Sequence, residues 1–156
     1  MKRRILHPTD FSSASRAAFA KAVAIAKADR DELVLLHVLT PPVAMVGEGY
    51  ISPKTYEDIA ASAQAWARRQ LDALVSKARK AGVRARGLLV EGVPHDAIVR
   101  GARSARAGLI VIGTHGRTGV ARFFLGSVAS RVAATAPCPV MTVRGKGAGR
   151  AARRRG

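Results

Sequence analysis

"GLIVIGTHGRTGVARFFLGSVASRVAATA", residues 108–136, joins a short apolar run to a helical pattern through a connection rich in glycine. The apolar run at 108–113 predicts a strand that is covered on both faces of a sheet. The pattern at 127–136 predicts a helix that stops before Pro137, because proline does not continue a helix. A buried strand that leads into a helix is the repeating unit of an α/β fold, so this stretch favours that class.

The same alternation extends outward from this unit over the rest of the chain. Apolar runs predict strands at 3–10, 32–39, 83–92, 108–113 and 138–144. Helical patterns lie between them, at 12–30, 53–82, 94–107 and 127–136, with Ser12 or Ser13 able to cap the first. This order predicts one α/β domain with a doubly wound, five-stranded parallel sheet flanked by helices. The Pro/Gly-rich connection at 40–52 is long enough to lie over a site.

Ligands of such a sheet bind beyond the carboxyl ends of the strands, where the strand order reverses. This rule selects residues 7–10, His37 with Val38, and the connection 113–126. The connection leads into a helix N-terminus, whose free N–H groups and partial positive charge favour phosphate. The site is therefore expected to take a phosphorylated ligand.

The connection has the spacing G-x2-G-x9-G-S, formed by Gly113, Gly116, Gly126 and Ser127. The first two glycines allow a sharp turn, Gly126 allows close approach of a phosphate to the backbone, and Ser127 adds a hydroxyl donor. Two arginines in the connection, Arg117 and Arg122, add cations. Neither the P-loop pattern nor G-x-G-x-x-G is present. The residues alone leave open a second interpretation, a glycine-bearing connection that binds nothing.

Composition and charge limit the classes of protein to which the chain can belong. The chain has 156 residues with 27 Lys and Arg against 10 Asp and Glu, a formal charge of +17 that attracts polyanions. Residues 145–156 predict a basic, disordered tail, either a solubilising extension or a nonspecific polyanion tether. Aromatic residues make up 4%, which argues against a platform for stacking single-stranded bases.

Location and cysteine chemistry follow from the same composition. The chain contains no run of about 18 apolar residues, so no membrane span is predicted. The first residues show no export signal. A single cysteine cannot form an internal disulfide, which favours a cytoplasmic protein. Cys138, flanked by prolines, is predicted to be a small buried residue at a strand start rather than a nucleophile.

The sequence resembles the universal stress protein family. The resemblance covers residues 3–144 and rests on "ILHPTDFSSAS", "LVLLHVL" and the block "GLIVIGTHGRTGVARFFLGSVASRVAATAPCPVMTVR", in that order. It implies a nucleotide-binding domain over 1–144 with a Rossmann-like fold of the adenine nucleotide alpha hydrolase kind. The spacing G-x2-G-x9-G-S is that of the ATP-binding members, so the resemblance implies ATP, with Mg²⁺ or Mn²⁺, as the ligand.

The resemblance also implies where the nucleotide contacts lie. Pro8, Thr9 and Asp10 would end the first strand, with Asp10 near the ribose and a nucleotide-bound metal, and Val38 would offer its backbone to adenine. The residues implied to line the nucleotide and surround its phosphates are Ile112, Gly113, Gly116, Arg117, Gly126, Ser127 and Val128. The residues themselves leave Asp10 a second role, as a cap of the helix that follows. The family more often has an apolar residue where this chain has His7.

The last strand is predicted to lie at the edge of the sheet, where an apolar strand invites pairing with its own copy across a two-fold axis. The resemblance likewise implies a homodimer through this strand. We expect the pairing at Val140 to Val143.

Catalysis has less support in the sequence. His7, His37 and His115 could face the crevice as polar lining, whereas His95 fits the first turn of a helix, and no pair has the spacing of a zinc site. No base for activating water accompanies Asp10, so no catalytic residue and no protein metal site are predicted.

The sequence therefore predicts an ATP-dependent stress-response or signalling module with at most slow ATP hydrolysis and an unidentified protein partner. The alternative is a basic nucleic-acid-associated protein with a vestigial nucleotide site. An adenylating enzyme is disfavoured because no second catalytic block is present.

Overall fold

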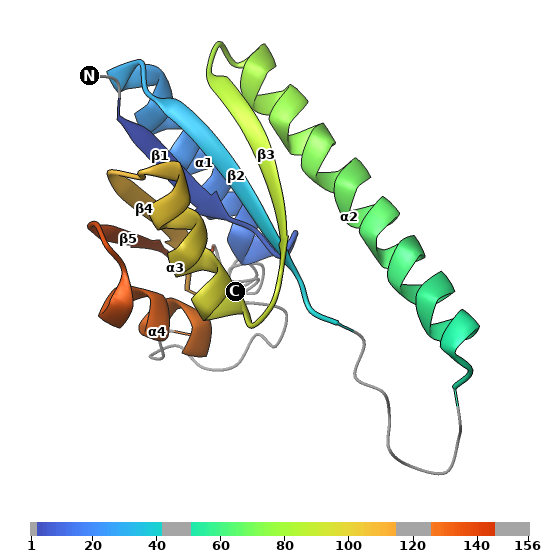
Figure 1. The fold of residues 1–156 in the computed structure, drawn as a ribbon. Coiled ribbons are helices and arrows are strands. Elements are labelled where there is room, and N and C mark those ends of the chain that lie inside the picture. The colour runs from blue at the N-terminus through green and yellow to red at the C-terminus, as the bar shows by residue number, and fades with distance from the viewer. Residues whose placement is uncertain (1–2, 42–50, 115–125, 146–156) are drawn as a thin grey trace, which may run out of the picture.

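The computed structural model describes residues 3–41, 51–114 and 126–145. Five parallel strands form one sheet in the order β3-β2-β1-β4-β5, and four helices cover its faces (Figure 1). The strands are β1 (Arg4–Pro8), β2 (Glu32–Leu39), β3 (Arg84–Glu91), β4 (Leu109–Gly113) and β5 (Val140–Val143). The helices are α1 (Ser13–Asp29), α2 (Pro53–Lys80), α3 (Pro94–Ala105) and α4 (Ser127–Thr135). The predicted fold class and element order are confirmed.

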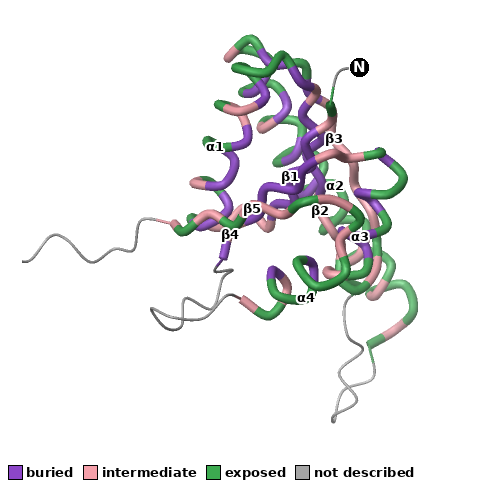
Figure 2. The backbone as a smooth tube through the Cα atoms, turned by 90° about the vertical axis from the view of Figure 1, so that its left-hand side faces the viewer, coloured by how far each residue is buried: buried purple, intermediate pink, exposed green. Residues whose placement is uncertain are grey.

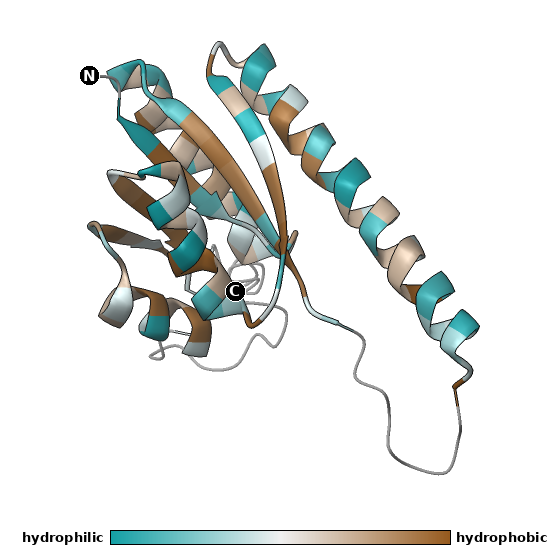
Figure 3. Ribbon diagram, viewed as in Figure 1, coloured by the Kyte–Doolittle hydropathy of each residue, from teal (hydrophilic) through white to brown (hydrophobic). Residues whose placement is uncertain are grey.

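Two apolar layers hold the helices on the sheet. Side chains of α1 and α2 pack on one face against a cluster that includes Ile5, Leu33 and Val111. Side chains of α3 and α4 pack on the other face against Leu6, Leu36 and other residues that alternate with the first set along the strands. Buried residues therefore concentrate along β1, β2 and β4, and apolar residues follow the strands (Figures 2 and 3).

Local capping sets the helix boundaries. Ser12 caps α1, since its hydroxyl accepts a hydrogen bond from the Ser15 amide at 3.2 Å. Ser52 caps α2 in the same way, and Pro53 occupies the first turn. Gly82 follows the end of α2 at a φ of +88°, the left-handed conformation that glycine adopts without strain.

Helix α2 reaches past the sheet. Its buried residues all lie in its second half, at Ala67, Leu71, Val75 and Ala78. Its N-terminal half stands away from the strands, beyond the carboxyl end of β2 (Figure 1). As a result, α2 brings side chains to the edge of the sheet at which a ligand crevice is expected.

The sheet opens between β1 and β4. Strand β1 pairs with β2 over its whole length from Arg4 to Pro8, but its pairing with β4 stops after Leu6. The strand order reverses at this position, because β2 and β3 extend the sheet to one side of β1, whereas β4 and β5 extend it to the other. The parting of the two strands creates the crevice that doubly wound sheets use for ligands.

Candidate functional site

A cavity of about 530 Å³ opens at the carboxyl ends of β1, β2 and β4. The strands and their turns contribute Pro8, Thr9, Asp10, Ser12, Leu36, His37, Val38, Leu39, Thr40, Ile112, Gly113, Thr114 and Gly126 to its lining. The helices contribute Ser15, Ala63, Trp66, Ala67, Pro94, Ile98, Ser127, Val128 and Ala129. The size of the cavity is that of a site for a small molecule or cofactor.

The turn between β1 and α1 is held rigidly by its own hydroxyl and carboxylate groups. The Thr9 hydroxyl accepts hydrogen bonds from the Phe11 amide at 3.1 Å and from the Ser15 hydroxyl at 2.9 Å. The Asp10 carboxylate accepts one from the Ser12 amide at 2.9 Å. Asp10 therefore supports the turn that starts α1, while Ser12 is the residue that caps the helix.

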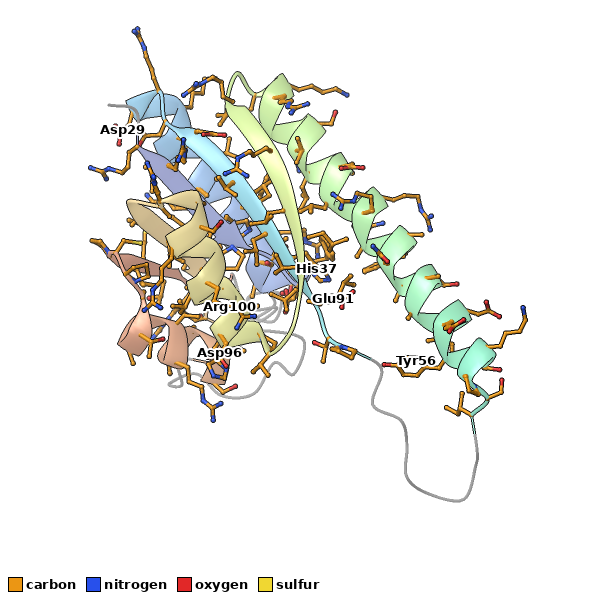
Figure 4. All side chains as sticks on the ribbon, viewed as in Figure 1. Asp29, His37, Tyr56, Glu91, Asp96 and Arg100 are labelled. Atoms are coloured by element: carbon orange, nitrogen blue, oxygen red, sulfur yellow. The ribbon has the colours of Figure 1, made fainter. Side chains whose placement is uncertain are left out.

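An aromatic cluster lies beside the cavity, and two of its members, His37 and Trp66, line it. The Phe11 ring stacks on His37 with 4.5 Å between ring centroids and meets the edge of Trp66 at 5.4 Å. The His37 Nδ1 donates to the Thr9 carbonyl oxygen at 2.7 Å, which places the proton on Nδ1 because a carbonyl can only accept. Figure 4 shows His37 at the carboxyl end of β2.

The start of α4 forms the opposite wall. Gly126 is its N-cap residue, and a glycine has no side chain with which to cap the first turn. The Gly126 amide donates to the Thr114 carbonyl oxygen at 2.7 Å. A Cβ atom on Gly126 would lie 2.6 Å from that oxygen, so the glycine is required for the close approach of the two backbone segments. The first-turn amides of α4 and the Ser127 hydroxyl meet at the cavity and suit an anion.

Gly113 also serves packing rather than a special turn. A Cβ atom on it would lie 3.0 Å from the Ala14 carbonyl oxygen of α1. Its φ is not among the positive values of the described glycines, which belong to Gly82 and Gly92. The spacing of glycines that predicted a phosphate loop therefore also brings β4, α1 and α4 close together.

The structure brings together nine of the eleven site residues named from the sequence. Pro8, Thr9, Asp10, Val38, Ile112, Gly113, Gly126, Ser127 and Val128 all line the one cavity. Gly116 and Arg117 lie outside the described residues, as do Arg122 and His115. Sequence reasoning missed the residues from α2, above all Trp66. The long helical pattern of α2 did not show that its first half overhangs the crevice.

The expectation that His7 could face the crevice is wrong. His7 is fully buried on the α1 side of the sheet, with its ring 6.1 Å from that of Phe19. Its Nδ1 donates to the Val111 carbonyl oxygen at 2.8 Å, at the position where β1 and β4 part. Its Nε2 has no partner among the described residues. Burial lowers the pKa of His7 from its ordinary 6.5 to about 4, so the ring is neutral at neutral pH.

Cys138 was expected to be buried at the start of the last strand, and the structure differs in both respects. It is half-buried against the α3–α4 layer and precedes β5, which starts at Val140. Burial raises the pKa of its thiol, which keeps the sulfur protonated and weakly nucleophilic.

The ionisable side chains among the described lining residues are Asp10 and His37. No three histidine, cysteine, aspartate or glutamate side chains within 3–41, 51–114 and 126–145 gather closely enough to hold a metal ion. In the same part of the chain, no helix has the length and apolar character needed to cross a membrane.

A doubly wound parallel sheet with a cavity at its switch point defines an α/β protein of the Rossmann-like class. The chain belongs to the universal stress protein family, whose model matches residues 1–144. It is similar to universal stress protein MJ0531 of Methanocaldococcus jannaschii, with 36% identity over 91% of this chain and 82% of that one.

Two solved structures share the fold. The structure of protein MJ0577, from the same organism, has a TM-score of 0.79 at 26% identity and covers 92% of this chain and 96% of its own. The universal stress protein from Archaeoglobus fulgidus, solved in complex with dAMP, has a TM-score of 0.62 at 25% identity and covers 92% and 98%.

Proposed function

We propose that this chain is an ATP-binding universal stress protein that acts as a nucleotide-dependent stress-response or signalling module in the cytoplasm. The observation that carries the proposal is the cavity of about 530 Å³ that runs from the start of α4, where glycine is the N-cap residue, to the ends of β1 and β2. The complex of a structural relative with dAMP supports an adenine nucleotide as the ligand.

Each end of the cavity suits one part of a nucleotide. The first-turn amides of α4, with Ser127 and Val128, would hold phosphate, and Gly116 and Arg117 would join them as the family resemblance implies. Val38 and Ile112 offer an apolar slot for the base, with the aromatic cluster of Phe11, His37 and Trp66 at its side. Asp10 lies between, where its carboxylate suits ribose hydroxyls and the water shell of a Mg²⁺ or Mn²⁺ ion carried by the nucleotide.

The proposal includes ATP hydrolysis that is slow at most. Both ionisable groups among the described lining residues are engaged, Asp10 with the Ser12 amide and His37 with the Thr9 carbonyl. His37 also lies at the β2 end of the cavity, across β1 from the start of α4. Fast phosphoryl transfer needs a group that orients the attacking water at the phosphate, and these two residues are better placed for binding.

Titration with ATP tests the binding site, because Trp66 is the single tryptophan of the chain and lines the cavity. We expect its fluorescence to change on addition of ATP and the Ser127→Ala variant to bind about ten-fold more weakly, since it loses one hydrogen bond to a charged group. Ser104→Ala removes an exposed hydroxyl of α3 outside the cavity and should bind as the wild type does. A dissociation constant above the millimolar range for the wild type, by fluorescence and by calorimetry, contradicts the proposal.

A homodimer through β5 is also proposed. β5 is an edge strand, and its Pro139 and Val143 carbonyls accept hydrogen bonds from β4. The alternate backbone groups, at Val140 and Thr142, therefore point away from β4 and are available to a second copy.

We expect Thr142→Pro to convert the dimer to a monomer, because it removes one outward amide without touching the β4–β5 ladder. Light scattering at micromolar concentration measures the mass, and Thr142→Val, which keeps the amide, is the matched control. A wild-type chain that is monomeric under these conditions rules the dimer out.

A further inference from the structure

The positive charge of the described residues is concentrated at one end of the molecule, opposite the crevice. The strands start and the first three helices end there. The cations at this end are Arg3, Arg4, Lys27, Arg30, Lys77, Arg79, Lys80, Arg84, Arg86, Arg103 and Arg106, against the carboxylates Asp29, Asp31 and Glu32. We call this set of cations the basic end. Figure 4 shows nitrogen-tipped side chains spreading from the end marked by Asp29.

Contacts show that the basic end is one continuous surface. Arg4 donates to the Ala105 carbonyl at the end of α3 and pairs with Glu32 at the start of β2. Glu32 also pairs with Arg86 of β3. The Asp31 carboxylate accepts from the Arg3 amide at 2.9 Å. Two of the three carboxylates are thus engaged, while nine of the eleven cations are exposed.

The crevice end is close to neutral. Its described carboxylates are Asp10, Glu57, Asp58, Glu91 and Asp96, against the cations Arg16, Lys54, Arg100 and Arg144. Helix dipoles explain part of this separation, because acids favour helix starts and bases favour helix ends. They do not explain Arg3, Arg4, Arg84 and Arg86, which lie at or beside the starts of strands.

The side chains of the basic end indicate which kind of polyanion it suits. Arginine outnumbers lysine, and its planar guanidinium group suits phosphate oxygens. The large apolar side chains that are exposed in the described part of the chain, Ile51, Ile59, Trp66 and Val93, all lie near the crevice end. The basic end therefore offers neither rings for stacking unpaired bases nor apolar groups for insertion into a membrane.

We propose that the basic end binds the phosphate backbone of duplex DNA without sequence preference. Such binding rests on arginine and lysine contacts to phosphates and needs no groove-reading element. It goes beyond the proposed nucleotide function and does not depend on it, because the two surfaces lie at opposite ends of the sheet.

Three full-length variants, each with four cations changed to glutamine, test the proposal. The first changes Lys80, Arg84, Arg103 and Arg106 at the basic end, which avoids the pairs of Glu32. The matched control changes Lys21, Arg68, Arg69 and Arg131, which lie along the helices between the two ends. The third changes Arg150, Arg153, Arg154 and Arg155 near the C-terminus. Binding is measured by the fluorescence anisotropy of a labelled 24-base-pair duplex between 50 and 200 mM NaCl.

We expect the basic-end variant to bind at least about ten-fold more weakly than the wild type at 100 mM NaCl. The slope of log affinity against log salt should fall by about 3 to 4, near 0.9 for each lost contact. Both other variants should stay within about three-fold of the wild type. If the basic-end variant does not fold, as judged by thermal unfolding, changing only Arg84 and Arg106 to glutamine tests the surface instead, and the salt slope should then fall by about 2.

Three results overturn the proposal. One is a wild-type chain that does not bind the duplex at 50 mM NaCl. Another is an equal loss in the control or the C-terminal variant, which would assign binding to diffuse charge or to the tail. The third is binding to vesicles with 30% phosphatidylglycerol that exceeds binding to the duplex, which would assign the basic end to a membrane surface.

Discussion

The Gly126→Val variant is expected to bind ATP about 100-fold more weakly than the wild type. A side chain at this position would place its Cβ atom 2.6 Å from the Thr114 carbonyl oxygen, closer than such atoms come in real structures. Because that oxygen belongs to the backbone, the start of α4 must move away from the end of β4. Loss of one or two hydrogen bonds to a charged phosphate, at about 1.5–3 kcal/mol each, is enough for a loss of this size.

A matched control separates this effect from a general cost of adding a side chain. Gly108→Val also creates a close contact, but with the side chain of Arg3, which is exposed and free to move. It lies at the far end of the sheet, so its ATP affinity should equal that of the wild type. Calorimetric titration measures both affinities. ATP binding by Gly126→Val within three-fold of the wild type would show that the start of α4 does not contact the nucleotide.

The second large effect concerns acid stability, which His7 is expected to control. Its pKa lies at about 4 in the folded chain against an ordinary 6.5, so the unfolded chain takes up a proton first as the pH falls. The contribution of neutral His7 is fully present above pH 6.5 and is lost between pH 6.5 and 4. A difference of this size corresponds to about 3 kcal/mol of unfolding free energy.

Comparison with His7→Leu isolates this contribution, because every other titrating group is common to both proteins. At pH 7 the wild type should be the more stable, since leucine leaves the Val111 carbonyl without its hydrogen bond at a cost of about 1–3 kcal/mol. Toward pH 4 that advantage should disappear or reverse. His95→Gln, a change at the half-buried start of α3, should follow the wild type. Denaturant unfolding at each pH measures the unfolding free energy of both proteins. If this free energy changes with pH in the same way for the wild type and His7→Leu, the assignment to His7 is disproved.

His7 also accounts for how the crevice opens. Its side chain donates a hydrogen bond to the Val111 carbonyl oxygen at the point where β1 stops pairing with β4. A backbone carbonyl freed at a strand separation needs a partner when it is buried, and the imidazole supplies one. His7 is therefore a structural feature of the switch point rather than a part of the cavity lining.

Most of the fold could be predicted from the sequence. Continuous apolar runs such as 32–39 and 108–113 have no other stable place than the middle of a parallel sheet covered on both faces. Ser12 and Pro53 mark helix starts through local hydrogen bonding and a fixed φ, which depend on neighbours in the chain. The switch-point rule likewise predicts that Thr9, Val38 and Gly126 lie at one site, since it depends only on strand order.

Only the tertiary structure decided the direction in which particular side chains point and which distant segments meet. His7 and Thr9 are two residues apart, yet one packs under α1 and the other lines the cavity, because the strand ends between them. Trp66 reaches the crevice because α2 overhangs the sheet, and its helical periodicity alone cannot show that. The requirement for glycine at 126 arises from a backbone oxygen twelve residues earlier. Local patterns follow from each residue and its neighbours, whereas these contacts depend on how whole elements pack in space.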